Sequence, residues 1–197
     1  TEGWKFAKEN KGIVDMVGEY NHASPGWYMH NQDYYDNYDR NAPSVCLAEW
    51  DSQGNAVENA LVEALYLCSI ERNADVVEME SHAMGSGDVA SSLALDITPS
   101  YYTQKLWGNN GGDKCVASTL SLPQAIGYRV GSSVVTGADG KLIVKIANAQ
   151  PSRLTLTMDG ASFADGTVAE GFAGKPGDKT VTTVKTNVKG QKVTLPA

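Results

Sequence analysis

The fold of this chain can be predicted from one stretch, Pro43-Ser-Val-Cys-Leu-Ala-Glu-Trp-Asp-Ser52. Its apolar part, residues 45–48, has no polar alternation, which is typical of a strand buried on both faces. Residues 57–70 then predict a helix with an apolar face. A buried strand, a turn and a covering helix make one unit of a parallel α/β structure.

Glu49 follows the apolar run directly and is the first candidate for chemistry. Parallel α/β folds place their reactive groups at the carboxyl ends of strands, so this position favours a catalytic role. The alternative is structural, because a carboxylate here can also cap the strand or pair with an arginine. Position alone does not separate the two.

Two more apolar runs, residues 13–17 and 76–79, predict further strands of the same kind. The first is predicted to end in the polar cluster Gly18-Glu-Tyr-Asn-His22, so functional residue types again follow an apolar run. The tyrosine-rich segment Trp27–Arg40 predicts a helix that covers the next strand. A shorter helix is predicted over Glu2–Asn10.

Asn109-Asn-Gly-Gly-Asp113 is the predicted boundary between two domains. Just before it, Thr98 as cap and Pro99 at the first helical position predict the start of a helix. Beyond it, residues 115–197 contain short alternating runs separated by turn signals such as Gly137-Ala-Asp-Gly140. This pattern of short alternating runs predicts an antiparallel β-sandwich. The sequence of this part contains no recognisable set of catalytic residues.

The composition excludes several functional classes. With 42% apolar residues, a net charge of −7 and no dense basic cluster, the 197-residue chain is not expected to bind nucleic acid. It has no apolar run long enough to span a bilayer, so no membrane partner is expected. The first residue is Thr1 rather than a methionine, which is consistent with a start inside a longer precursor.

The three cysteines, Cys46, Cys68 and Cys115, are widely spaced and odd in number. This pattern argues against a zinc site and against a disulfide framework, and buried free thiols are the favoured interpretation. The cysteines do not determine the cellular compartment of the protein. A secreted or periplasmic location is preferred over a cytoplasmic one.

No metal or other cofactor is expected. Asp33, Asp36 and Asp39 recur every third residue, but no calcium-type loop accompanies them and a solvated helix face is the simpler interpretation. An extended segment would put Glu78, Glu80 and His82 on one face, yet the sequence points to no further ligand. Serine-hydrolase, phosphate-loop and dinucleotide motifs are absent from the sequence.

With these segments located, the sequence resembles the α-L-arabinofuranosidases of glycoside hydrolase family 51. The resemblance covers most of residues 13–107 in order and is carried by five stretches: Gly18-Glu-Tyr-Asn-His-Ala-Ser-Pro-Gly-Trp27, Tyr35-Asp-Asn-Tyr-Asp-Arg40, Cys46-Leu-Ala-Glu-Trp50, Ala64 to Val77, and Thr98-Pro-Ser-Tyr-Tyr-Thr-Gln-Lys-Leu106.

The resemblance implies a (β/α)8 TIM barrel followed by a β-sandwich. Residues 1–112 would then be the C-terminal part of the barrel, with its last three strands at 13–20, 44–50 and 75–81, and residues 113–197 would be the sandwich. It implies a retaining glycosidase that releases α-L-arabinofuranosyl residues from arabinose-containing polysaccharides or oligosaccharides. Glu49 falls at the position of the catalytic nucleophile.

The sequence departs from the family pattern at one strand end. The family usually has Asp-Glu-His-Tyr-Tyr where this chain has Gly18-Glu-Tyr-Asn-His22, so Tyr20 stands at the His position and His22 at a Tyr position. The loop before Thr98 is also shorter than usual. Tyr20, His22 and Trp50 are nonetheless the candidates for the rim of a small sugar pocket, with ordinary core packing as the alternative.

The general acid/base of the family, the Glu of an Asn-Glu pair on an earlier strand, has no counterpart here. Glu19 is the nearest acidic candidate within the chain, although the family gives it no such role. The expected partners are therefore the carbohydrate substrate and the missing N-terminal half of the barrel, and the isolated chain is expected to be inactive. A homo-oligomer stays open. The alternative is a non-catalytic or degenerate relative that binds carbohydrate or has a structural role.

Overall fold

The computed structural model describes residues 2–83 and 97–197. Its first half is a parallel sheet in the order β1-β2-β3, preceded by the helix α1 (Glu2–Glu9). The strands are β1 (Met16–Ala23), β2 (Ser44–Ser52) and β3 (Val77–His82). Both pairings are parallel, which confirms the arrangement expected for the three apolar runs.

The limits and burial of two strands differ from the prediction. β1 begins at Met16 rather than at residue 13 and continues through the whole polar cluster to Ala23, because these residues pair with β2 as far as Ser52. In β2, Val45 and Leu47 are buried, whereas Cys46 and Ala48 on the other side are partly exposed. The predicted burial on both faces is therefore wrong for the part of the chain that the structure describes, and one face of the sheet is open.

The predicted helix over residues 27–40 is also wrong. Only α2 (Pro25–His30) forms, started by the Ser24 cap, and turns follow it to Arg40. One guanidinium nitrogen of Arg40, Nη1, donates to the carbonyl oxygens of Tyr35, Asp36 and Tyr38 at 3.2, 2.8 and 2.9 Å. The Tyr35 carbonyl also accepts from the Tyr38 N–H at 3.2 Å, whereas the carbonyls of Asp36 and Tyr38 accept from this side chain where a helix would use backbone N–H groups. The periodic aspartates accordingly lie in turns and not on a helix face.

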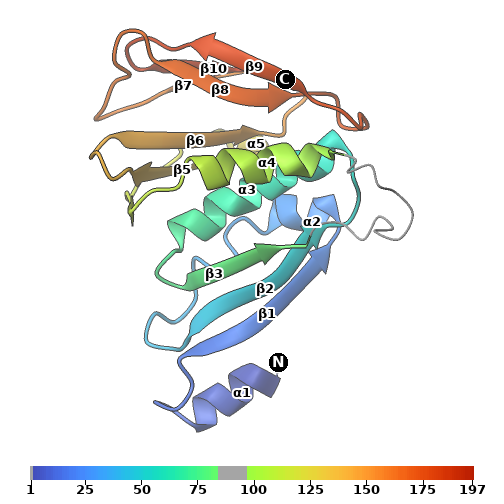
Figure 1. The fold of residues 1–197 in the computed structure, drawn as a ribbon, viewed down its shortest axis with the longest axis vertical. Coiled ribbons are helices and arrows are strands. Elements are labelled where there is room, and N and C mark those ends of the chain that lie inside the picture. Colours follow the sequence, from blue (N-terminus) through green and yellow to red (C-terminus); the bar gives the residue numbers. More distant parts are fainter. Residues whose placement is uncertain (1, 84–96) are drawn as a thin grey trace.

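Helix α3 (Val57–Arg72) is the centre of the molecule, and most of its 16 residues are buried. It packs on β2 at one side and on β5 (Val130–Thr136) and β6 (Leu142–Asn148) at the other, with α4 (Pro99–Asn109) alongside. Figure 1 shows α3 and α4 lying between the parallel sheet and these antiparallel strands. A helix covered on all sides has no solvent face, which explains why its apolar residues extend around the whole circumference.

The second half is antiparallel throughout the described pairings, as predicted. Its sheets are β4-β5-β6, β7 with β10, and β8 with β9. The elements are β4 (Lys114–Cys115), α5 (Gln124–Gly127), β5 (Val130–Thr136), β6 (Leu142–Asn148), β7 (Leu154–Thr157), β8 (Val168–Ala173), β9 (Thr182–Asn187) and β10 (Lys192–Leu195). The predicted turn Gly137–Gly140 joins β5 to β6, and Gly140 has the positive φ of 77° that such turns require.

The two halves share a buried polar contact. Lys145 of β6 forms an ion pair with Glu71 of α3, and the Ser133 hydroxyl donates to the same carboxylate at 2.5 Å. Nearby, Cys68 is fully buried, and burial raises its thiol pKa to about 12. All three cysteines are free, with Cys46 half-buried and Cys115 exposed.

None of the helices in the described ranges is long and apolar enough to cross a bilayer. The loop before Thr98, predicted to be shorter than usual in the family, falls largely on residues 84–96, which lie outside the described residues.

Candidate active site

The two faces of the parallel sheet have different roles. Leu47 and Trp50 of β2 are fully buried against the helices, so the neighbouring side chains of a pleated strand must face the open side. On β1, Glu19 and Asn21 bond to groups on the helix-covered side, which leaves Tyr20 on the open face.

Glu49 reaches the open face because β2 contains one extra residue. Glu19 pairs with Leu47 and the next residue, Tyr20, pairs with Glu49, so Ala48 has no partner on β1. In an unbroken pleat, Leu47 and Glu49 would face the same side. The bulge at Ala48 puts the Glu49 carboxylate on the exposed side and returns Trp50 to the core.

Three of the four predicted site residues come together on this face. Tyr20 lies opposite Glu49 and is 71% exposed, and His22 follows one pleat further along β1. All lie toward the carboxyl ends of the strands, where parallel folds place their chemistry. Glu49 therefore has the exposure and position that its predicted role requires.

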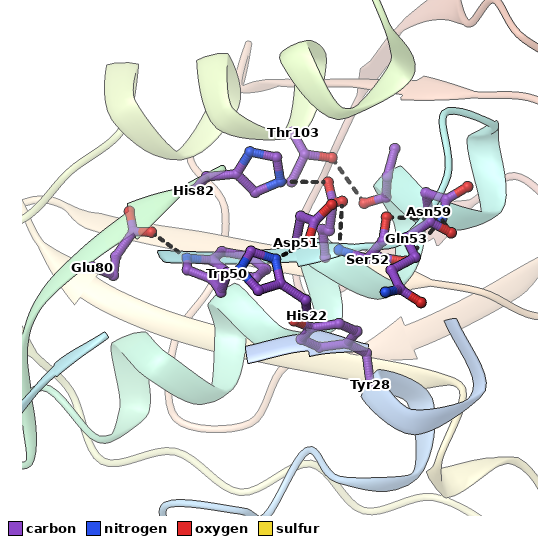
Figure 2. Close-up of polar contacts among 12 residues, drawn as sticks. His22, Tyr28, Trp50, Asp51, Ser52, Gln53, Asn59, Glu80, His82 and Thr103 are labelled. Carbon is purple, nitrogen blue, oxygen red and sulfur yellow. Dashed lines mark hydrogen bonds and ion pairs between the residues drawn. The ribbon is translucent and has the colours of Figure 1, made fainter. Parts of the chain in front are cut away.

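Trp50, the fourth predicted residue, is directed into the core. It is 0% exposed, its indole Nε1 donates to Glu80 at 2.6 Å, and its ring contacts Tyr28, Tyr66 and His82. Figure 2 shows the Trp50 indole beside Glu80 and separate from the polar contacts of Asn59. In this structure the core-packing alternative describes Trp50, which lies on the core side of the strand that carries Glu49.

Glu19 lies on the face opposite to Glu49. Its carboxylate accepts hydrogen bonds from Trp4 Nε1 at 2.8 Å, Tyr38 Oη at 2.8 Å and Tyr35 Oη at 3.1 Å. Three donors on one buried side fix this carboxylate as a structural acceptor. It cannot act on a substrate bound at Glu49 from this position.

The tyrosines behind the sheet are held as neutral hydroxyl donors. Burial raises the pKa of Tyr28, Tyr35 and Tyr38 well above the ordinary value, and it raises that of Tyr66 to about 12. Tyr28 uses its hydroxyl to donate to the Asn21 carbonyl at 2.6 Å, which fixes the backbone of β1 beside the site.

Asn59 secures the end of β2 to the start of α3. Its side-chain oxygen accepts from the Ala56 N–H at 3.0 Å, and its Nδ2 donates to Ser52 and Gln53 (Figure 2). Gly54 passes so close that a Cβ there would lie 2.7 Å from Asn59 Oδ1. The turn directly after the site is thus closely packed and polar.

Asp51 was missed as a site residue by sequence reasoning. In the structure Asp51 belongs to β2 and lies opposite His22, with Oδ1 2.5 Å from the ring Nδ1. The signal that could have found it is its spacing of two residues from Glu49, which puts both carboxylates on one face of a strand.

Glu80 and His82, two of the residues weighed as metal ligands, have other partners. Glu80 accepts from Trp50, and His82 Nε2 lies 3.2 Å from the buried Glu63 carboxylate. Within residues 2–83 and 97–197, no group of three or more His, Cys, Asp or Glu side chains has the arrangement of a metal site.

Comparison with known proteins identifies a family. The sequence profile described as the α-L-arabinofuranosidase C-terminal domain matches residues 18–197. An extracellular exo-α-L-arabinofuranosidase from Streptomyces chartreusis is 35% identical over 171 residues, which cover 81% of this chain and 20% of that protein. The α-L-arabinofuranosidase A of Aspergillus kawachii is 27% identical over 169 residues, covering 77% of this chain and 26% of the relative.

Solved structures show the same fold. The arabinose-bound MgGH51 α-L-arabinofuranosidase superposes with a TM-score of 0.77 and 22% identity, over 100% of this chain and 37% of that one. The GH51 arabinofuranosidase of Xanthomonas axonopodis pv. citri gives a TM-score of 0.65 with 16% identity, over 98% of this chain and 53% of the other. The chain spans about a quarter or less of the length of the two curated relatives, from Streptomyces chartreusis and Aspergillus kawachii.

Proposed function

The chain belongs to the α-L-arabinofuranosidase C-terminal domain family, and from this premise we propose that it is the C-terminal part of a retaining glycoside hydrolase. The enzyme releases α-L-arabinofuranosyl residues from arabinose-containing polysaccharides or oligosaccharides. Glu49 is its nucleophile. The observation that carries this proposal is the exposure of Glu49 on the open face, at the carboxyl end of the central parallel strand.

In this proposal, residues 1–112 complete a (β/α)8 barrel and residues 113–197 form a β-sandwich. The open face supports the barrel assignment. The apolar side chains of Cys46 and Met79 are partly exposed on this face, and among the described residues nothing covers them. Among the described residues, the outer edges of β1 and β3 have no strand partner, which supports it as well, since parallel strands in a barrel are paired on both sides. The missing strands are the partner of this chain.

A retaining mechanism needs a second carboxyl group about 5–5.5 Å from the nucleophile. That group protonates the leaving oxygen while Glu49 attacks the anomeric carbon and forms a glycosyl-enzyme, and it then activates water to release the sugar. Glu19 cannot supply it, because its carboxylate is bound on the opposite face. The resemblance to the family implies that the acid/base comes from the N-terminal part of the barrel.

We also propose that the enzyme is exported. The support is the Streptomyces chartreusis relative, which is described as extracellular.

Glu49→Gln in the full-length enzyme tests the proposed role of Glu49. We expect kcat on an aryl α-L-arabinofuranoside to fall by about a thousandfold or more, because the amide cannot form the covalent intermediate. Glu78→Gln is the matched control: it neutralises another exposed carboxylate of the same sheet and should leave kcat within about twofold. A mechanism-based inhibitor should label Glu49, as detected by peptide mass spectrometry.

Two results would contradict this proposal. One is full activity of Glu49→Gln in the full-length enzyme. The other is arabinofuranoside hydrolysis by the purified 197-residue chain that is abolished in Glu49→Gln, because the acid/base would then have to lie within this chain. Binding of arabinose without any turnover by the full-length protein would favour the non-catalytic alternative.

A further inference from the structure

His22 and Asp51 form a side-chain pair on the open face of the parallel sheet. They lie opposite each other on β1 and β2, one pleat beyond Tyr20 and Glu49, and Nδ1 lies 2.5 Å from Oδ1 (Figure 2). Their side chains are 40% and 21% exposed. The pair is therefore partly exposed on the face that carries Glu49.

The backbone on both sides of this pair is held by the core. Asn21, before His22, accepts from the Tyr28 hydroxyl at 2.6 Å through its carbonyl. Trp50 and Ser52, on either side of Asp51, are 0% and 1% exposed. The two side chains thus project from fixed strands, unlike the exposed ion pair of Asp139 and Lys141 within a turn. A pair presented in this way loses little conformational freedom when it forms.

The contact assigns different roles to the two ring nitrogens of His22. A carboxylate accepts only, so Nδ1 must carry the proton and donate to Asp51. In the neutral ring Nε2 is then an acceptor. Within residues 2–83 and 97–197 no hydrogen bond to Nε2 is found, so the ring has one nitrogen in use and one available.

We propose that Asp51 is a positioning residue that fixes the tautomer and orientation of His22, so that His22 Nε2 accepts a hydrogen bond from a hydroxyl group of the arabinofuranosyl ring held at Glu49. This rests on the function proposed above. The pair determines specificity, because a site built to bind a sugar hydroxyl rejects analogues that lack it. The His22 ring thus has its own anchor at a position where family members usually carry a tyrosine.

Nitrogen NMR of the 197-residue chain tests the positioning step without any activity. Histidine-labelled protein should show His22 with the proton on Nδ1, assigned by comparison with His22→Gln. In Asp51→Asn the amide can donate to the ring instead, and the proton should move to Nε2 or divide between the two nitrogens. Asp75→Asn is the matched control, since it removes another exposed carboxylate ion pair, with Arg40. It should leave the His22 signals unchanged.

Kinetics of the full-length enzyme test the contact with the sugar. Asp51→Asn should lower kcat/KM on an aryl α-L-arabinofuranoside about tenfold, the effect of one hydrogen bond, and Asp75→Asn less than twofold. Aryl substrates lacking the 2-, 3- or 5-hydroxyl identify the group that is bound. On one of them the difference between Asp51→Asn and the unmodified enzyme should disappear.

The outcomes distinguish this inference from the proposed function. A His22 ring protonated on Nε2 in the unmodified chain would overturn the positioning role of Asp51. Equal sensitivity of all three deoxy substrates to Asp51→Asn, with normal Glu49-dependent hydrolysis, would overturn the hydroxyl contact and leave the glycosidase intact. A full-length protein that hydrolyses no arabinofuranoside would overturn both the glycosidase function and the sugar contact.

Discussion

At the scale of single residues, the site depends on a few polar side chains that act from behind it. Asn59 is the clearest of these, because one amide group binds the start of α3 and the end of β2 together. It was not expected from sequence, where it is one polar residue in a helix. Its role requires knowledge of where the turn at Ser52–Gly54 passes, which no local pattern contains.

Asn59→Ala should lower the free energy of unfolding by about 2 kcal/mol, because it leaves the buried Ala56 N–H and Ser52 groups without partners. Urea denaturation measures the change. Asn41→Ala is the control, since among the described residues its side chain bonds only to Asp39, two residues away at an exposed position. We expect it to change stability by less than about 0.5 kcal/mol, and equal effects of the two substitutions would contradict the prediction.

At the scale of elements, the strand and helix around Glu49 and the helix start at Thr98–Pro99 were predicted from sequence. Their signals are local: an apolar run, a helical period and a proline after a capping residue. The end of β1 and the Trp27–Arg40 segment were predicted wrongly because their structure depends on distant partners. β1 extends by pairing with β2, and Arg40 binds the carbonyls that a helix would have used.

Helix α3 depends on a distant element in a way that sequence does not indicate. Its first free N–H groups, those of Val57 and Glu58, donate to the carbonyls of Asp178 and Pro176 at 2.9 and 3.0 Å. Both carbonyls belong to the loop between β8 and β9, which Figure 1 shows descending toward the start of α3. The antiparallel half thus caps the helix that supports the candidate nucleophile strand.

Gly174→Ala tests this cap. A Cβ at Gly174 would lie 2.8 Å from Val57 Cγ2, so the loop must move away from α3, and we expect a loss of about 1–3 kcal/mol. Gly177→Ala, in the same loop, meets nothing within 4 Å and should change stability by less than about 0.5 kcal/mol. Thermal or urea unfolding compares them. Combining Gly174→Ala with Val57→Ala should cost less than the sum of the two, and strict additivity would argue against the contact.

At the scale of the whole molecule, the order of a parallel α/β half and an antiparallel β half was predicted correctly. The way in which the two halves join was not predicted. Helix α3 packs against both halves, and one hydrophobic core extends from Tyr28 and Trp50 to Ala147 of β6. Sequence periodicity describes one face at a time, and the second contact surface of α3 belongs to strands about seventy residues away.

The buried hydroxyl and thiol groups of this core predict sensitivity to alkali. Cys68 and Tyr66 have pKa values of about 12 in the folded chain, above their ordinary values of 9.0 and 10.0. A raised folded pKa contributes stability that is fully present below the unfolded pKa and is lost as pH rises toward the folded one. Stability should therefore fall between about pH 9 and pH 12, with a slope of up to about 1.4 kcal/mol per pH unit per group.

Urea unfolding between pH 8 and pH 11, with tyrosinate absorbance as a second probe, measures this loss. Cys68→Ala should reduce the slope between pH 9 and pH 10, where the thiol is the group that titrates first on unfolding. Cys46→Ala is a control at a half-buried cysteine. A stability that is constant up to pH 11 would contradict the prediction.

The bulge at Ala48 has a consequence for how the length of this chain can change. Adding or removing one residue within a strand normally turns over every side chain beyond it, which destroys the core face and the functional face together. β2 already holds a surplus residue, and without Ala48 the side chains of Leu47 and Trp50 would still fall on the core face with Glu49 between them. Deletion of this one residue should therefore leave both faces of the strand in order, so β2 can be shortened by one residue beside Glu49.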